Sequence, residues 1–300
     1  LDTIPGQFLD TVSKLDIHRG FSHSIVFAVL ISPILGFLLK KLYKKKNEAS
    51  TWEWTQLMFW AIFTHPLLDI FTTWGTQFLW PMDWRIAIQS IFVIDPIYTI
   101  PFLITLIVVL FLKRNNPKRK KINRIGLVIS TSYLLITVGL KLFIDQVFTN
   151  SLEKQNIAYS RFETRPTPLN TILWTANAEA NDAFYIGYYS FFDQSDIDFY
   201  KFPKNHELLN PYRNNNDIER LLFLTKGYYI LKQVESGIEM YDLRFGLTEG
   251  FDQGKGDFVF TYLIQEKNGE LEITQKPNSF EGMRDLLPKL IERIGGTKSF

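Results

Sequence analysis

Four long apolar segments lie within residues 23–148, and short runs of lysine and arginine separate the first from the second and the third from the fourth. This pattern constrains the fold more than any other feature of the chain. The hydrophobic segments cover residues 23–42, 52–71, 86–112 and 125–148. About 20 mostly apolar residues span a bilayer as a helix, and a proline such as Pro33 is tolerated better in a membrane helix than in a soluble one. The sequence therefore predicts a membrane all-α bundle of about four transmembrane helices.

The basic residues predict how these segments are oriented. Lysine and arginine concentrate in residues 40–46 and 113–124. Loops on the cytoplasmic side of membrane proteins carry an excess of these two residue types. We therefore place both basic loops in the cytoplasm, so that the chain enters its first segment from the outer side.

The composition changes after the fourth hydrophobic segment, and we predict no further span. Residues 172–192 and 228–265 contain runs rich in Tyr, Phe, Ile and Val, which are typical of strands. Residues 281–294 have the apolar spacing of a helix. We predict a transmembrane helical domain over residues 1–150, followed by a small soluble α+β domain over residues 151–300 on the extracytoplasmic side.

The composition also limits the chemistry. The chain has no cysteine, which excludes disulfides and thiolate metal ligands. A bound metal would be held by histidine and carboxylate, which suits zinc, with manganese or magnesium as alternatives. The net charge is only +2, and the basic loops are explained by topology and anionic lipid headgroups. We therefore expect membrane lipid as a partner, no nucleic acid, and no protein partner that the sequence identifies.

Three of the four histidines lie in two short motifs. His65 and Asp69 are four residues apart, so they share one face of a helix. His18 and His23 flank the start of the first hydrophobic segment. The topology was inferred from lysine and arginine alone, and it places these four residues near the same outer face. We therefore interpret them as the ligands of a metal site.

Each of these residues also has a structural interpretation. A histidine hydrogen-bonded to its own helix neighbour would explain His65 and Asp69 about equally well, if the pair stood alone. Ionisable groups inside a membrane segment, however, are costly and usually functional. A single histidine at the interface can simply reach water. Because His18 and His23 would face a third histidine, we favour ligation for them as well.

Several other polar residues have open alternatives. Arg19 could pair with an anionic substrate or with lipid phosphates. Asp95, which precedes a proline in an apolar run, could act as a ligand or general base, or could cap a broken helix. We interpret Lys141 and Asp145 as an ion pair within one helix, and His206 as a solvated surface residue.

The motifs around these residues resemble the YdjM/YbcI family of inner-membrane proteins, which are described as metal-dependent hydrolases. The matching stretches are His18-Arg-Gly-Phe-Ser-His-Ser, Thr64-His-Pro-Leu-Leu-Asp and Phe92-Val-Ile-Asp-Pro. The resemblance covers roughly residues 5–148, and the second domain is similar to a soluble tail that some members carry. It implies a bacterial inner-membrane protein with a divalent metal.

The chain departs from the family pattern near its beginning. Members usually start with Met-Asp-x-x-Thr-His, whereas this chain begins at Leu1, so we expect that an upstream segment is missing. Members also carry Pro-Asp-x-Asp ahead of the histidine motif. Here Asp10 fits the second aspartate and Phe8 takes the place of the first. The resemblance therefore adds Asp10 as a candidate ligand or general base, and it predicts an incomplete site if the first aspartate is a ligand.

We therefore predict a membrane-bound metal-dependent hydrolase that acts on a phosphoester or lipid-like substrate at the outer face. The assigned residues are the metal candidates His18, His23, His65 and Asp69, the catalytic candidates Asp95 and Asp10, and the substrate-binding candidate Arg19. A bound zinc ion lowers the pKa of water toward about 7. The alternative is a non-catalytic membrane anchor or sensor whose outer α+β domain binds a partner. A transporter is a third possibility, which the absence of an internal repeat disfavours.

Overall fold

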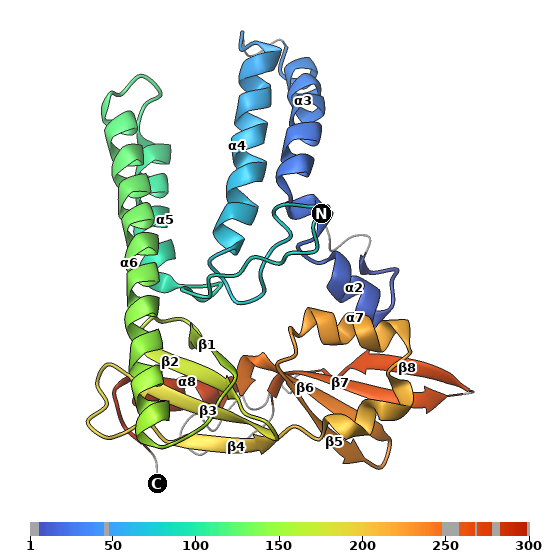
Figure 1. The fold of residues 1–300 in the computed structure, drawn as a ribbon. Helices are drawn as coiled ribbons and strands as arrows, with labels where there is room; N and C mark the ends of the chain where they lie inside the picture. The colour runs from blue at the N-terminus through green and yellow to red at the C-terminus, as the bar shows by residue number, and fades with distance from the viewer. Residues whose placement is uncertain (1–5, 45–47, 248–257, 268, 278–282, 299–300) are drawn as a thin grey trace. The chain divides into compact units, whose positions relative to one another are not determined.

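The computed structural model describes residues 6–44, 48–247, 258–267, 269–277 and 283–298. The chain forms two compact units, Leu1–Ile88 and Gln89–Phe300. The described part of the first unit is mainly helical, and the second joins two further helices to a β-rich region (Figure 1). The compositional boundary predicted near residue 150 falls inside the second unit, at the end of its longest helix.

The first unit is built around a helical hairpin. Its elements are α2 (Thr11–Ile17), the 3-10 turn η1 (Phe21–His23), α3 (Ile25–Leu42) and α4 (Thr51–Asp69). Ser24 begins α3, because its side chain accepts a hydrogen bond from the Phe27 amide. Ser50 begins α4 through a capping box with Glu53. Such caps satisfy amide groups that have no partner within the helix.

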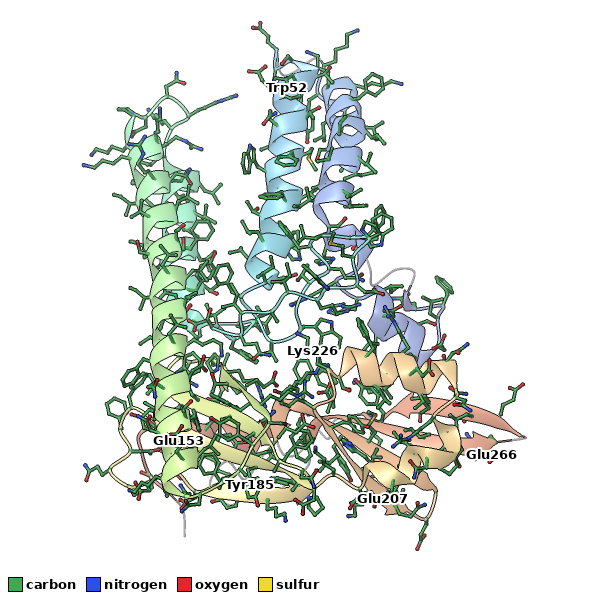
Figure 2. All side chains as sticks on the ribbon, viewed as in Figure 1. Trp52, Glu153, Tyr185, Glu207, Lys226 and Glu266 are labelled. Atoms are coloured by element: carbon green, nitrogen blue, oxygen red, sulfur yellow. The ribbon has the colours of Figure 1, made fainter. Side chains whose placement is uncertain are left out.

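Helices α3 and α4 run side by side in opposite directions (Figure 1). A Cβ atom at Gly36 would lie only 2.5 Å from the Thr55 hydroxyl oxygen. The two backbones can therefore approach this closely because α3 has a glycine here. At the loop end of the hairpin the Tyr43 and Trp54 rings stack 5.5 Å apart, and Trp52 lies in the first turn of α4 (Figure 2).

The second unit begins with another helical pair, α5 (Pro96–Phe111) and α6 (Lys118–Lys154). Asp95 caps α5 by accepting a hydrogen bond from the Tyr98 amide at 3.0 Å. The later part of α6 packs on a sheet, where Ile144 and Phe148 share a buried cluster with Trp174. One helix therefore belongs to both the helical pair and the core of the β-rich region.

The β-rich region contains two antiparallel four-stranded sheets, with strand orders β1-β2-β3-β4 and β5-β6-β7-β8. The first sheet comprises β1 (Arg161–Pro166), β2 (Leu173–Glu179), β3 (Ala183–Ser190) and β4 (Phe199–Pro203). The second comprises β5 (Tyr229–Val234), β6 (Gly237–Leu247), β7 (Phe258–Lys267) and β8 (Glu270–Gln275). The other elements are η2 (His206–Tyr212), α7 (Asn216–Leu224) and α8 (Met283–Ile294). A shared apolar core joins the sheets, with Phe184 and Ile186 from one and Leu243 and Leu247 from the other.

The prediction of helices followed by a β-containing region with helices is confirmed, but the prediction of four spans is wrong. Among the described residues, two helices are long and apolar enough to cross a membrane, α3 and α6. The predicted segment 86–112 is broken, because its helix starts only at Pro96 and has 16 residues, about 24 Å at 1.5 Å per residue. Helix α4 has the length but carries several polar residues, among them Glu53, Thr64 and His65.

Candidate metal centre

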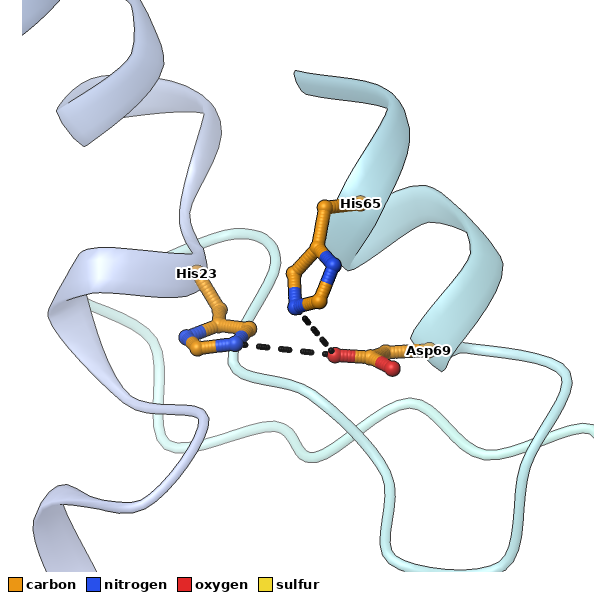
Figure 3. A group of neighbouring side chains, drawn as sticks. All are labelled: His23, His65 and Asp69. Carbon is orange, nitrogen blue, oxygen red and sulfur yellow. Dashed lines mark ion pairs between the residues drawn. The ribbon is translucent and has the colours of Figure 1, made fainter. Parts of the chain in front are cut away.

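Three of the predicted ligands converge in the first unit. His23 lies at the end of η1, and His65 and Asp69 lie in the last turns of α4. One potential ligand atom from each lies within 4.8 Å of the other two. Figure 3 shows both imidazole rings pointing toward the Asp69 carboxylate. The helical spacing of His65 and Asp69 and the hairpin pairing of α3 with α4 bring the three together.

The distances suit a small cation. Nε2 of His23 and Nε2 of His65 each lie 3.5 Å from Asp69 Oδ2. Zinc bound tetrahedrally at about 2.1 Å from each ligand sets neighbouring ligand atoms about 3.4 Å apart. Both nitrogen-to-oxygen distances therefore match an edge of such a site, and the two nitrogens lie within 4.8 Å of each other.

Asp69 has one satisfied carboxylate oxygen and one orphaned oxygen. Its side chain is only 12% exposed. Oδ1 pairs with the Arg19 guanidinium, whose Nη2 lies 3.3 Å away. Oδ2 is buried and accepts no hydrogen bond from the described residues. A buried polar atom without a partner is costly, and a cation between Oδ2 and the two imidazoles would remove that cost.

Neighbouring groups hold these ligands in place. Nη1 of Arg19 donates to the Thr72 hydroxyl at 2.6 Å, and that hydroxyl donates to the Asp69 carbonyl at 2.8 Å. Ser22 Oγ lies 3.0 Å from His23 Nδ1, which leaves Nε2 facing Asp69. Such outer contacts fix the ring orientation of histidine ligands in metal sites.

The centre has one open side. The His65 side chain is 68% exposed, whereas those of His23 and Asp69 are 14% and 12% exposed. Three protein ligands with an accessible remaining position is the arrangement typical of catalytic rather than structural zinc. The solvent-facing side of the group is therefore the side that His65 forms.

Arg85 supports the centre and was not singled out from the sequence. Its guanidinium donates to the carbonyls of His18 and Asp16, at 2.7 and 2.5 Å. These bonds hold the turn at Arg19, where the backbone has a φ of 54°, a conformation that is uncommon for residues other than glycine. No spacing rule pairs Arg85 with a turn 66 residues earlier, and the isolated bridge between Thr76 and Ile86 brings it there.

The other predicted residues have different surroundings. His18 lies outside the group of three, and its ring packs edge-on against Trp74, 5.0 Å away. Asp10 caps α2 by accepting from the Ser13 amide at 2.9 Å. This hydrogen bonding to Ser13 lowers the pKa of Asp10, which does not favour a general base at neutral pH.

Asp95 belongs to the second unit, and both of its oxygens have partners there. Oδ1 accepts from the Tyr98 amide, and Oδ2 accepts from the Tyr133 hydroxyl at 3.0 Å. This arrangement matches the capping alternative considered for Asp95 in the sequence. The catalytic assignments of Asp95 and Asp10 stay predictions.

Comparison with known proteins identifies the family of the N-terminal region. The sequence model of the YdjM inner membrane protein family matches residues 1–144, which confirms the resemblance. An uncharacterized protein of Bacillus subtilis (strain 168), YfhP, is 34% identical over 96 residues, 29% of this chain and 28% of YfhP. The alignment thus spans less than a third of that relative. No solved structure matches the chain significantly.

Proposed function

Residues 1–144 belong to the YdjM inner membrane protein family, and on that premise we propose that this membrane protein is a metal-dependent hydrolase. The observation that carries the proposal is the orphaned Asp69 Oδ2, which faces two imidazole nitrogens at 3.5 Å. His23, His65 and Asp69 would hold the ion, with His18 as a further candidate. Zinc fits this nitrogen and oxygen donor set, with manganese or magnesium as alternatives.

A divalent ion would supply a polarised substrate bond and an activated water at neutral pH. Neighbouring residues of the chain would hold the side chains that bind the ion in the required orientation. Arg19 holds Asp69 through Oδ1, so that Oδ2 stays directed at the histidines, and Ser22 fixes the His23 ring. The sequence predicts Arg19 as a substrate-binding residue. Because its side chain is already engaged by Asp69 and Thr72, we propose instead that Arg19 positions the Asp69 carboxylate for the ion.

We also propose a multi-pass orientation in the inner membrane. Lysines end α3 and begin α6, and the charge rule assigns both ends to the cytoplasm. His23, at the opposite end of α3, would then lie at the outer face, and the β-rich region after α6 would be extracytoplasmic. A centre at this depth suits a phosphoester or lipid-like substrate.

Hydrolysis of phosphodiester substrates by the purified protein, with zinc and with manganese, tests the proposed function. We expect activity that is lost on chelation, restored by metal, and absent in His65→Ala. Because the His65 side chain is largely exposed, this variant should fold normally, which circular dichroism checks. Metal-independent hydrolysis, or hydrolysis unchanged in His65→Ala, would contradict the proposal.

One observation favours the alternative, a non-catalytic anchor or sensor. Arg19 already pairs with Asp69, so an ion pair alone could account for the burial of this carboxylate. Under that alternative, alanine at His65 would leave the cellular phenotype unchanged, while substitutions on exposed faces of the β-rich region would abolish it. The effect of His65→Ala therefore distinguishes the two functions: a hydrolase would lose its activity, whereas an anchor or sensor would keep its cellular function.

A further inference from the structure

A short exposed loop in the first unit carries an unusual density of large apolar side chains. Six consecutive residues, Leu79-Trp-Pro-Met-Asp-Trp84, are all exposed, and five of them are apolar. Met82 is 55% exposed and Trp84 66% exposed. We call these six residues the aromatic tip. Large exposed apolar groups gathered in one place mark an interaction surface rather than ordinary surface residues.

The aromatic tip is held on an ordered base. Thr76 and Ile86 bond to each other through both backbone amides, at 3.0 Å each, and so close the loop. The Gln77 side chain donates to Asp83 at 2.8 Å, which engages the one charged side chain of the tip. In contrast to the tip, Thr76, Gln77 and Arg85 are buried. The apolar side chains are therefore presented outward by a fixed turn.

The loop is attached to the start of the candidate span α3. The Ile25 amide donates to the Phe78 carbonyl at 3.1 Å, and the Phe21 and Trp80 rings contact edge-on at 4.8 Å. The basic residues of α3 lie at its other end. The 18 residues of α3 measure about 27 Å, close to the roughly 30 Å of the bilayer hydrocarbon.

We propose that the aromatic tip inserts into the outer leaflet of the membrane, at the boundary between headgroups and acyl chains. A lipid surface is the occupant that fits, because the tip is continuous with the non-basic end of a span and has no lysine or arginine. Tryptophan is enriched at this depth, where one part of its ring is apolar and another is polar. Membership of an inner-membrane family supports the proposal, which does not depend on a metal or on hydrolysis.

The insertion would also fix the depth of the candidate metal centre. Phe78, at the base of the loop, packs on Phe63 of α4 with ring centroids 5.6 Å apart. Two residues further along α4 is His65, on the exposed side of the centre. The tip would therefore hold the open side of the centre near lipid headgroups, from which an amphiphilic substrate could enter.

Site-directed spin labelling tests the proposal directly, because the chain has no cysteine of its own. Met82→Cys would carry a nitroxide label in the full chain, reconstituted in vesicles of equal parts phosphatidylethanolamine and phosphatidylglycerol. Collision rates of the label with oxygen, which concentrates in lipid, and with a water-soluble nickel complex report its depth. We expect oxygen collisions to exceed nickel collisions for this label.

Two control positions in the same unit calibrate the reading. Glu48→Cys lies in the exposed segment beyond the basic end of α3 and should favour nickel, whereas Ile34→Cys on the exposed face of α3 should favour oxygen most. The Met82→Cys value should fall between them. A value equal to that of Glu48→Cys would overturn the proposal. Nickel protection without oxygen access, or spin–spin broadening between labels, would indicate a protein surface or a second copy and would equally contradict it.

Discussion

Buried carboxylates are treated differently in the two units. In the β-rich region Asp242 is fully buried, and its two oxygens accept from the backbone amide, Nε and Nη2 of Arg244. Asp193 is paired in the same bidentate manner with Arg293. In the first unit, Arg19 pairs with Asp69 through Nη2 alone, and its Nη1 donates to the Thr72 hydroxyl instead.

This difference separates a structural role from a binding role. A buried ion pair persists when hydrogen bonds satisfy its remaining lone pairs, as they do at Asp242 and Asp193. Among the described residues Asp69 Oδ2 has no hydrogen-bond donor, and the Nε2 atoms of two histidines lie 3.5 Å from it instead. The β-rich region uses these carboxylates to stabilise itself, whereas Asp69 has an oxygen that the proposed ion would occupy.

The largest effect should come from breaking a satisfied pair. Asp242→Ala leaves the Arg244 guanidinium buried without its partner, and we expect a loss of about 3–5 kcal/mol in the free energy of unfolding. Thermal unfolding in detergent, followed by near-ultraviolet circular dichroism, measures it. Asp182→Ala removes the exposed partner of Lys201 and serves as the matched control, with an unchanged midpoint. If Asp242→Ala and Asp182→Ala had equal unfolding midpoints, the Asp242–Arg244 pair would not stabilise the fold, and its contrast with Asp69 would be wrong.

Asp69→Asn should have the reverse profile. We expect zinc affinity to fall by more than the roughly 10–100-fold that is typical for loss of an outer contact, because the neutral amide replaces a charged carboxylate ligand. Stability without metal should change less than in Asp242→Ala, since the amide oxygen can still accept from Arg19 in place of Oδ1, and Oδ2 accepts no hydrogen bond from the described residues. Competition with a zinc-chelating dye measures the affinity. A large loss of stability with unchanged affinity would assign Asp69 to the structural class.

Arg19→Gln should have a smaller effect on the metal than Asp69→Asn. The guanidinium orients the carboxylate without touching the ion, and loss of such outer contacts typically reduces metal affinity about 10–100-fold. The readout is zinc affinity measured as a function of pH, since a merely structural loss would lower stability without moving this curve. Arg19→Lys, which keeps the charge, should recover part of the affinity.

The smallest effect concerns pH and a histidine outside the centre. His206 Nε2 lies 2.9 Å from the Tyr229 carbonyl, and its ring stacks on the Tyr229 ring. Burial lowers the pKa of His206, so the unfolded chain binds the proton more readily than the folded one. Stability is therefore retained above about pH 6.5 and is lost as the pH falls below it. His206→Gln should flatten this dependence, and unfolding midpoints at pH 7 and pH 5 would show it.

Local rules predicted the parts of the fold that depend on nearby residues. The spacing of His65 and Asp69 on α4 is confirmed, as is the Lys141–Asp145 pair, 3.2 Å apart. What the spacing could not show is that Lys141 also donates to the Thr164 hydroxyl on β1. The interpretation of His206 as a solvated residue is wrong, because its ring is half-buried and stacks on Tyr229. Local sequence could not show this, since Tyr229 lies 23 residues away.

The predicted number of membrane spans was wrong because hydropathy alone does not show where a helix begins. The start of a helix depends on hydrogen bonds to a capping side chain. Asp95 and Pro96 begin α5 in the middle of what reads as one apolar segment. The proximity of His23, His65 and Asp69 was predicted, because helical spacing and charge-based topology placed them near one another; the metal itself stays a prediction. The roles of Arg19 and Arg85 depend on a positive-φ turn and a long-range bridge, which no local pattern encodes.

The central claim is that His23, His65 and Asp69 together hold a divalent ion. X-ray absorption of the purified protein loaded with one equivalent of zinc tests it most directly, since it reports the atoms around the ion. We predict a shell of nitrogen and oxygen atoms at about 2.0–2.1 Å with imidazole scattering from at least two histidines, reduced by one imidazole in His65→Ala. An ion surrounded only by water oxygens, or a spectrum unchanged in His65→Ala, would contradict the account.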